Sequence, residues 1–305
     1  MINLLLYSIL DCQKLLFSQG KSNQNMLKLD ISQERIKSEY TDDNSKFIVI
    51  DKMKVHYRDE GEGAPLVLLH DAGLSLFIWN EIIPFLTNHF RVIRLDLPGF
   101  GLTTASERFD YSMDKYIYFI KKFTASVGLS LDMFSILGAG FGGHIAWQYT
   151  LLHQHRVNKL ILINAQGYDT SNSLSLFKFD KKNSFGKFLM RWRGNSWMLK
   201  QLLRKQIGKE IIINDKMIRE IQDLLLSKNN RKSLIKLSNA AVKNRQQRIS
   251  EIKTPSLIIW GSHVEKVGFE KDLPNVQLNE YEGIGLLPML EDSKKTAEDI
   301  IQFLQ

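Results

Sequence analysis

Cysteine is almost absent from the sequence: Cys12 is the single cysteine in a chain of 305 residues. One thiol cannot form an internal disulfide framework, and it cannot build a zinc site of several thiolates. The sequence therefore carries no sign of an oxidising compartment. Internal repeats, low-complexity tracts and glycine-rich phosphate loops are missing as well, which excludes a repeat architecture as the starting expectation.

A long hydrophobic run is also missing. The apolar stretch near the N-terminus, residues 3–10, is followed by Asp11 and Lys14 and is too short to span a membrane as a helix. It lacks the basic leading region and small-residue cleavage site of a signal peptide. Residues 1–20 are predicted to form an amphipathic helix, which either docks on the body of the protein or rests on a membrane surface. The predicted location is the cytoplasm, with peripheral membrane contact through this helix.

What the chain does contain is a globular composition, with 44% hydrophobic and 24% charged residues, and enough length for a sizeable core. Short apolar runs alternate with segments of helical spacing, and residues 65–70 are continuously apolar, as in a strand buried on both faces. This alternation predicts an α/β fold, a mostly parallel sheet with helices on both faces. The predicted strands are residues 47–51, 54–59, 65–70, 91–96, 133–138, 159–164, 255–261 and 276–283, and the predicted helices are residues 77–86, 111–127, 141–152 and 293–304.

Residues 165–254 break the alternation, because they read as helices and loops without a clear strand. They hold 20 Lys/Arg and 7 Asp/Glu, a net charge of +13 in a chain whose total is +8. An insertion of this length has its own structure and commonly roofs the site of an α/β fold. We therefore predict an N-terminal helical extension over residues 1–45 and one domain over residues 46–305, with 165–254 as a helical lid.

Within the insertion, residues 185–206 interleave aromatic and aliphatic residues with Arg and Lys. Two interpretations are open. The segment is either a lid helix with an apolar face over a cavity and a solvated basic face, or a surface that contacts an anionic membrane or an acidic partner. Nucleic acid is not an expected partner, because no recognised nucleic-acid-binding module accompanies the basic charge. The sequence carries no signal for an oligomeric state.

The glycines at 138, 140 and 142 superficially match the start of a dinucleotide-binding fingerprint. The following strand, residues 159–164, does not end in the acidic residue that would bind a ribose. We therefore expect no dinucleotide, and nothing in the sequence predicts another cofactor or a metal site.

Four segments carry a family resemblance: residues 56–101, with the turn Asp-Leu-Pro-Gly-Phe-Gly, and residues 135–149, 256–262 and 281–292. Together with the order of strands and helices, they make residues 45–305 resemble the α/β-hydrolase superfamily. The resemblance is closest to the esterases, epoxide hydrolases and dehalogenase-like enzymes with a helical lid. It implies the α/β-hydrolase fold, with a nucleophile, an acid and a base on three separate loops.

The nucleophile of this family lies on a strained strand-to-helix turn written Gly-x-Ser-x-Gly. In this chain the turn is Gly138-Ala139-Gly140-Phe141-Gly142, so the flanking glycines are kept and Gly140 stands at the nucleophile position. A glycine has no side chain with which to form a covalent intermediate.

The positions of the acid and the base are altered as well. The family's acid follows the seventh strand in a pattern like Trp-Gly-x-x-Asp, where this chain has Val264, one residue before Glu265. The alternative acid position, after the sixth strand, is Asn164, which cannot ionise. The family's histidine is replaced by Leu286 in a tail that keeps its glycines, its proline and Glu291. Neither leucine nor valine can transfer a proton, so the resemblance implies a degenerate triad.

The oxyanion motif differs too, since the family has His-Gly after the third strand and this chain has His70 followed by Asp71. A carboxylate beside the oxyanion hole would oppose a developing negative charge. Asp71 is more simply explained as a brace of its loop through backbone N–H groups. The backbone N–H groups of Ala72 and Phe141 could still form a donor pair.

These losses predict a pseudo-hydrolase that binds a small apolar ligand under the lid, or a partner, without cleaving it; an enzyme is not the favoured class. A second hypothesis is a hydrolase or lyase that uses Asp71, His263 or Glu265 with a bound water. It requires Asp71 and His263 to lie within hydrogen-bond reach across the site. A third hypothesis is an interaction protein at the membrane surface, acting through residues 1–20 and the basic insertion.

Overall fold

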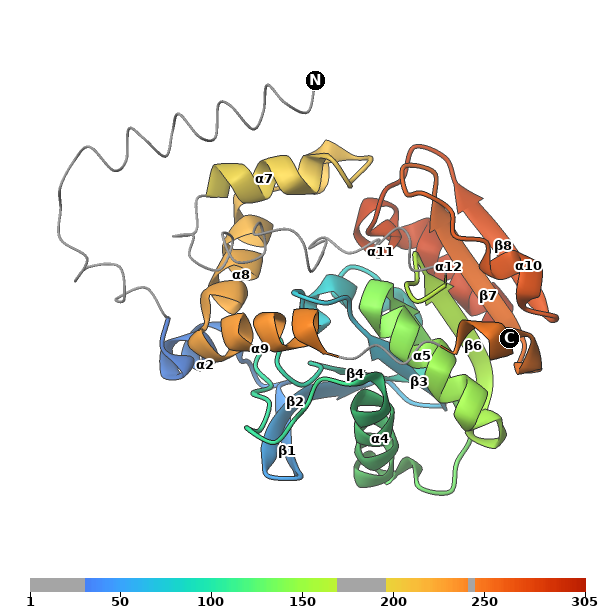
Figure 1. The fold of residues 1–305 in the computed structure, drawn as a ribbon. Helices are drawn as coiled ribbons and strands as arrows, with labels where there is room; N and C mark the ends of the chain where they lie inside the picture. Colours follow the sequence, from blue (N-terminus) through green and yellow to red (C-terminus); the bar gives the residue numbers. More distant parts are fainter. Residues whose placement is uncertain (1–30, 169–195, 241–244) are drawn as a thin grey trace, which may run out of the picture. The chain divides into compact units, whose positions relative to one another are not determined.

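The computed structural model describes residues 31–168, 196–240 and 245–305 of the chain, drawn in colour in Figure 1. The amphipathic helix expected over residues 1–20 lies outside these residues. So does the first half of the mixed basic and aromatic segment 185–206, namely residues 185–195.

The described chain has one sheet of eight strands, which are β1 (Lys46–Ile50), β2 (Met53–Glu60), β3 (Ala64–Leu69), β4 (Phe90–Leu95), β5 (Phe134–Ala139), β6 (Val157–Ile163), β7 (Ser256–Gly261) and β8 (Val276–Tyr281). Their order in the sheet is β1-β2-β4-β3-β5-β6-β7-β8 (Figure 1). The β1–β2 and β2–β4 pairs are antiparallel and the other pairs are parallel. The mostly parallel sheet predicted from the apolar runs is therefore confirmed.

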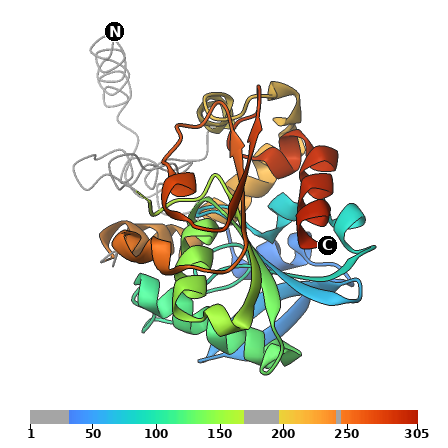
Figure 2. The same cartoon turned by 90° about the vertical axis from the view of Figure 1, so that its right-hand side faces the viewer.

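Helices cover both faces of this sheet, with α4 (Met113–Thr124) and α5 (Gly140–Leu152) on one face and α3 (Ile83–Leu86) and α12 (Ser293–Leu304) on the other (Figure 2). Along β3, Val67 and Leu69 belong to the apolar cluster of α4 and α5, whereas Leu66 and Leu68 belong to the cluster of α3 and α12. Successive side chains of a strand point to opposite faces. The apolar run 65–70 is thus explained by burial on both sides of the sheet, as predicted.

The single helix predicted over residues 77–86 is wrong, because the structure has two short segments there, the 3-10 helix η2 (Leu76–Trp79) and then α3. Pro84 is the physical reason. It lies in the first turn of α3, where its missing N–H leaves no bond unmade. Inside a continuous helix its ring would clash with the carbonyl group four residues earlier.

Between β6 and β7 the described residues form α7 (Ser196–Arg204), α8 (Asp215–Leu226) and α9 (Lys228–Asn239), and they add no strand to the sheet. In α9, Nδ2 of Asn230 donates to the carbonyl oxygen of Gly101, after β4, at 2.9 Å. The helical character expected of the insertion is confirmed for its described part. Its role as a lid and the proposed domain boundaries stay predictions.

Helix α2 (Gln33–Tyr40) begins after Ser32, whose hydroxyl accepts the N–H of Arg35 as an N-cap. Its last residue, Tyr40, donates its hydroxyl to Asp223 of α8 at 2.9 Å, so that the insertion also contacts the start of the described chain. The remaining short elements are the π-helical turn η3 (Ala125–Leu129), the 3-10 helices η4 (Gln154–Arg156), η5 (Glu210–Ile212) and η6 (Gln246–Glu251), and the helices α10 (Phe269–Asp272) and α11 (Pro288–Glu291).

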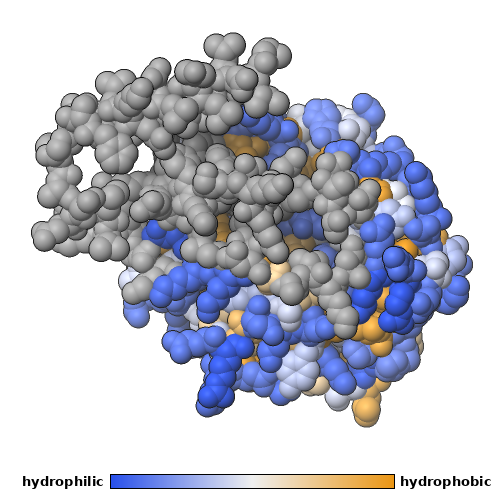
Figure 3. All heavy atoms as spheres, in the orientation of Figure 1, coloured by the Kyte–Doolittle hydropathy of each residue, from blue (hydrophilic) through white to orange (hydrophobic). Residues whose placement is uncertain are grey.

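No helix in the described ranges has the length and apolar character needed to cross a membrane. On the face drawn in Figure 3, hydrophilic residues cover most of the coloured surface, and hydrophobic residues show as separate patches.

Candidate functional site

The carboxyl ends of β3 and β5 mark the point where the connections of the sheet reverse direction. After β3 the chain continues into β4 on one side, whereas β5 lies on the other side of β3. In open α/β sheets the loops diverge at such a point, and ligands bind there. Asp71 comes just after β3 and Gly140 directly follows β5, so this topology makes their surroundings the candidate site.

Gly140 is the first residue of α5 and has a φ of +51°, in the left-handed region that favours glycine. A Cβ added to it would lie 2.2 Å from Cγ of Asp71. The space that a side chain would take at Gly140, the predicted nucleophile position, is therefore filled by the Asp71 carboxyl group. The flanking Gly142 is required for another reason, because a Cβ there would lie 2.2 Å from the carbonyl oxygen of Leu69.

Asp71 is buried, with 1% of its surface exposed, and its Oδ1 accepts several hydrogen bonds. The backbone N–H groups of Ala72 and Phe141 each donate to Oδ1 at 2.7 Å, and Nε2 of Gln166 donates to it at 3.3 Å. The expected bracing through backbone N–H groups is confirmed. The expected place beside the oxyanion hole needs a correction, since the carboxyl group lies between the two predicted donors and accepts both of their hydrogen bonds.

The second oxygen of this carboxyl group is unpaired. Oδ2 of Asp71 is buried and has no hydrogen-bond partner within the ranges that the structure describes. Burial raises the pKa of Asp71 to about 7, and the hydrogen bonds from Phe141 and Ala72 oppose that rise. The direction follows from physical chemistry, because a buried carboxylate without a counter-ion is disfavoured against its neutral form.

His70 holds the backbone of the loop after β3, which carries Asp71, in place through two hydrogen bonds. Its Nδ1 is 2.7 Å from the carbonyl oxygen of Asp71, and its Nε2 accepts the N–H of Leu97 at 2.9 Å. These two contacts define a neutral tautomer with the proton on Nδ1. Burial lowers the pKa of His70, which keeps it in this form, so His70 positions the loop.

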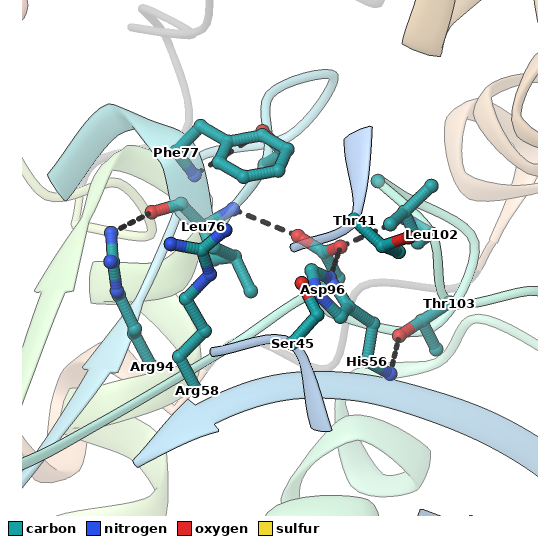
Figure 4. Close-up of polar contacts among 12 residues, drawn as sticks. Thr41, Ser45, His56, Arg58, Leu76, Phe77, Arg94, Asp96, Leu102 and Thr103 are labelled. Carbon is teal, nitrogen blue, oxygen red and sulfur yellow. Dashed lines mark hydrogen bonds and ion pairs between the residues drawn. The ribbon is translucent and has the colours of Figure 1, made fainter. Parts of the chain in front are cut away.

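Asp96 ties the loops after β3 and β4 together (Figure 4). Its Oδ1 accepts the N–H of Leu76 at 2.8 Å, and its Oδ2 accepts the N–H of Leu102 at 2.8 Å and lies 2.8 Å from Nδ1 of His56. Leu76 follows Asp71 along the same loop. The retained Asp-Leu-Pro-Gly turn therefore holds the candidate site in place from one side.

Val264 and Leu286, which the motifs predict to be the positions of the acid and the base, lie in apolar surroundings. Val264 follows β7 and is half-buried, and its carbonyl oxygen accepts Nε1–H of Trp260 at 3.0 Å. Leu286 follows β8 and is buried in one apolar cluster with Leu203 and Ile207 of the insertion. The structure thus gives Leu286 a packing role between the β8 loop and the inserted helices.

Asn164, at the alternative acid position after β6, joins the two loops that carry Val264 and Leu286. Its Nδ2 donates to the carbonyl oxygens of Gly285 at 3.0 Å and Leu286 at 2.9 Å, and its Oδ1 accepts the N–H of Gly261 at 3.0 Å. Two carbonyl oxygens can be satisfied only by a donor. This position therefore suits an amide, which explains why it does not carry the acid.

We expect Asn164→Asp to lower the free energy of unfolding by roughly 3 kcal/mol at pH 8, because a carboxylate would face two carbonyl oxygens and make neither bond. At pH 4 part of the loss returns, since the neutral acid donates one hydrogen bond. Urea unfolding at both pH values measures this. Asn44→Asp, at an exposed position, is the matched control and should change stability by less than about 0.5 kcal/mol. Equal effects of the two substitutions would contradict the assigned role of Asn164.

Glu291, the glutamate retained in the tail motif, also connects the loop after β8 to the insertion. Oε2 of Glu291 accepts the N–H groups of Gly208 at 2.7 Å, Lys209 at 3.1 Å and Gly285 at 2.9 Å, and its Oε1 accepts the N–H of Leu287 at 3.1 Å. The motif therefore keeps Glu291 for its backbone contacts, which need no catalytic partner.

The other titratable candidates are not brought to Asp71. His263 and Glu265 are exposed on the loop after β7, whereas Asp71 is buried. His263 donates its backbone N–H to Ile284 at 3.0 Å. The hydrogen-bond contact that an Asp71–His263 mechanism requires is thus missing from the described contacts. The described residues contain no group of three or more His, Cys, Asp or Glu that could hold a metal ion.

One residue of the site, Gln166, was not singled out from the sequence. Gln166, two residues after Asn164, donates to Asp71, and its backbone N–H donates to the carbonyl oxygen of Gly140 at 3.0 Å. His144 of α5 is buried, and its Nε2 lies 2.7 Å from Nε2 of Gln148. Burial lowers the pKa of His144 to about 3. The only signal available for Gln166 was its place near the carboxyl end of β6.

Comparison with known proteins agrees with this fold. Residues 64–207 match a family model described as alpha/beta hydrolase fold. Monoacylglycerol lipase ABHD6 of Homo sapiens is 23% identical over 265 residues, which are 80% of this chain and 76% of that protein. The 2-hydroxy-6-oxo-6-(2'-aminophenyl)hexa-2,4-dienoic acid hydrolase of Metapseudomonas resinovorans is 31% identical over 137 residues, 44% of this chain and 46% of that protein.

A solved structure of a membrane phospholipase A, described as a bacterial virulence factor, is similar with a TM-score of 0.73 at 20% identity. It covers 100% of this chain and 98% of its own. At this identity the likeness shows a shared fold.

Proposed function

The chain belongs to the α/β-hydrolase superfamily, and from that premise we propose that it binds a small, largely apolar ligand without hydrolysing it. The observation that carries the proposal is the pair formed by Asp71 and Gly140. The position of the nucleophile has no side chain, and a carboxyl group from the neighbouring loop fills the space, 2.2 Å from where a Cβ would lie.

The hydrogen bonds of Asp71 support the same proposal. Ester hydrolysis in this family depends on donors that are free to stabilise a developing oxyanion. Here the N–H groups of Ala72 and Phe141 already donate to Oδ1 of Asp71. A substrate carbonyl would have to displace a buried carboxyl group and would then lie next to its charge.

Leu286 and Val264 give the proposal further support. Neither can act as a general acid or base, and both add apolar surface near the loops that end at the candidate site. The relatives are named for a monoacylglycerol and for a substituted hexadienoic acid. We infer that this chain keeps the capacity of the fold for small, partly apolar molecules, whereas the reaction has been lost.

We predict that the purified full chain does not release p-nitrophenol from short-chain p-nitrophenyl esters faster than a heat-inactivated sample. A fluorophosphonate probe should leave no adduct in the intact mass, because Gly140 offers no nucleophile. Cys12→Ser is the control, since it removes the single thiol as a source of background reactivity. A burst of p-nitrophenol or a label within residues 138–142 would refute the non-hydrolytic proposal.

Peripheral membrane contact stays a prediction. The insertion carries a net charge of +13, and each Lys or Arg near an anionic surface contributes on the order of 1 kcal/mol within a Debye length. We expect weak co-sedimentation with phosphatidylserine vesicles at low salt and loss of binding at physiological salt. A variant without residues 1–20 separates the contribution of the N-terminus. Absence of binding at low salt would remove the membrane hypothesis.

A further inference from the structure

Asp71 leaves one polar atom without a partner in the candidate site. Its Oδ2 is buried and accepts no hydrogen bond from the described residues, whereas its Oδ1 accepts hydrogen bonds from Ala72, Phe141 and Gln166. Buried polar atoms are satisfied in the great majority of cases. The unpaired atom of this site is therefore a carboxyl oxygen, which is an acceptor when Asp71 is ionised.

In the family motif, this part of the fold offers hydrogen-bond donors to a ligand instead of an acceptor. With glycine in place of Asp71, the N–H groups of Ala72 and Phe141 would be unoccupied, and the site would offer donors to the carbonyl oxygen of an acyl compound. In this chain both donors are taken at 2.7 Å. What the site offers in their place is Oδ2, the second oxygen of the Asp71 carboxyl group.

We propose that Asp71 reverses the ligand preference of the site, so that it binds small alkylammonium compounds through Oδ2 instead of binding acyl compounds through the two backbone N–H groups. This inference rests on the proposed function, because it names the ligand class of the same non-hydrolytic site. Asp71 is then its specificity-determining residue.

An ammonium group fits better than a hydroxyl group because Asp71 lacks a counter-ion. The carboxyl group is perturbed by burial and by two backbone N–H groups, with no cationic side chain among the causes. A buried charge is stabilised by a paired opposite charge with hydrogen bonds. The alkyl part of the ligand would lie near apolar side chains such as Phe141, which packs on Tyr116 with ring centroids 5.1 Å apart.

The test is the binding of three probes of equal chain length, n-hexylammonium, 1-hexanol and hexanoate, to the full chain by isothermal titration calorimetry. The wild type should prefer hexylammonium to hexanoate by about tenfold or more, the effect of one charge-assisted hydrogen bond. Asp71→Asn keeps the shape and should lose about tenfold in hexylammonium affinity. Asp71→Ala frees the N–H groups of Ala72 and Phe141 and should turn the preference toward hexanoate. Asp43→Asn, which removes an exposed carboxylate, should change nothing.

The outcomes separate the two proposals. If hexylammonium binds equally to the wild type and Asp71→Asn, or if the wild type prefers hexanoate, the ligand inference is overturned while a binding protein remains. If no variant binds any probe, both the inference and the proposed binding function fail. If Asp71→Ala does not fold, Asp71→Asn alone still decides the inference.

Discussion

Replacing Gly140 by serine is expected to lower the free energy of unfolding by roughly 4 kcal/mol and to produce no esterase activity. The new Cβ would lie 2.2 Å from Cγ of Asp71, so the carboxyl group must leave its place. The N–H groups of Ala72 and Phe141 would then lose their acceptor while buried. Overpacking and unpaired donors each cost about 1–3 kcal/mol. Urea unfolding monitored by tryptophan fluorescence measures the loss.

The double variant Asp71→Gly with Gly140→Ser is the control, because it exchanges the two side chains for the pair found in the family motif. It should recover about 2 kcal/mol relative to the single serine variant, which a double-mutant cycle reports as coupling between contacting sites. Additive effects would show that the two residues do not share one space. Esterase activity would further require Val264→Asp and Leu286→His, since triad members act as a unit.

The second large effect concerns pH. Asp71→Asn is expected to become more stable than the wild type as the pH rises, by roughly 4 kcal/mol in total between pH 4 and pH 8. The pKa of Asp71 is raised from 3.8 to about 7 in the folded chain. Between these values the folded state holds a proton that the unfolded state has released. Wild-type stability therefore falls as the pH rises through this window and levels off above it, and asparagine has no such transition.

Urea unfolding of both proteins at pH 4.5, 6, 7 and 8 tests this expectation. Burial also raises the pKa of Glu220 to about 7 and lowers that of His144 to about 3. Both groups are present in the two proteins, so their contributions cancel in the difference. Asp43→Asn is the matched control at an exposed position. A difference between wild type and Asp71→Asn that does not change with pH would mean that Asp71 ionises at its ordinary pKa.

The sheet was largely predictable because its signal is local. The four leucine and valine residues of 66–69 are all fully buried, and a continuous apolar run is what a strand covered on both faces requires. The helix over 77–86 was mispredicted for an equally local reason, since Pro84 interrupts a pattern whose apolar spacing alone looks helical. The spacing of apolar residues can be read from a sequence. Whether a proline ends a helix or begins a new one at that point depends on the backbone conformation around it, which the spacing does not reveal.

The candidate site was predictable only as a set of positions. The motif placed Gly140, Val264 and Leu286, yet the filling of the Gly140 space by Asp71 depends on distances of about 2 Å between residues on different loops. Gln166 contacts Asp71 across 95 positions of the chain. From the sequence, Asn164 was identified only as a residue that stands at the alternative acid position and cannot ionise. Its donation to two carbonyl groups could not be predicted, because those groups lie on the loop after β8 and reach Asn164 only in the folded protein.

The contacts of Glu291 have a consequence for how the protein is made. Gly208 leaves the ribosome 83 residues before the carboxylate that accepts its N–H, a delay of about 4–17 s at ordinary rates of synthesis. By then β3 and β5 have been synthesised, and Asp71 can already meet Phe141. The apolar residues of the inserted helices that pack in one cluster with Leu286, in contrast, stay exposed until Leu286 has been synthesised. Of the two regions, the insertion is therefore the one that a nascent-chain chaperone would have to protect.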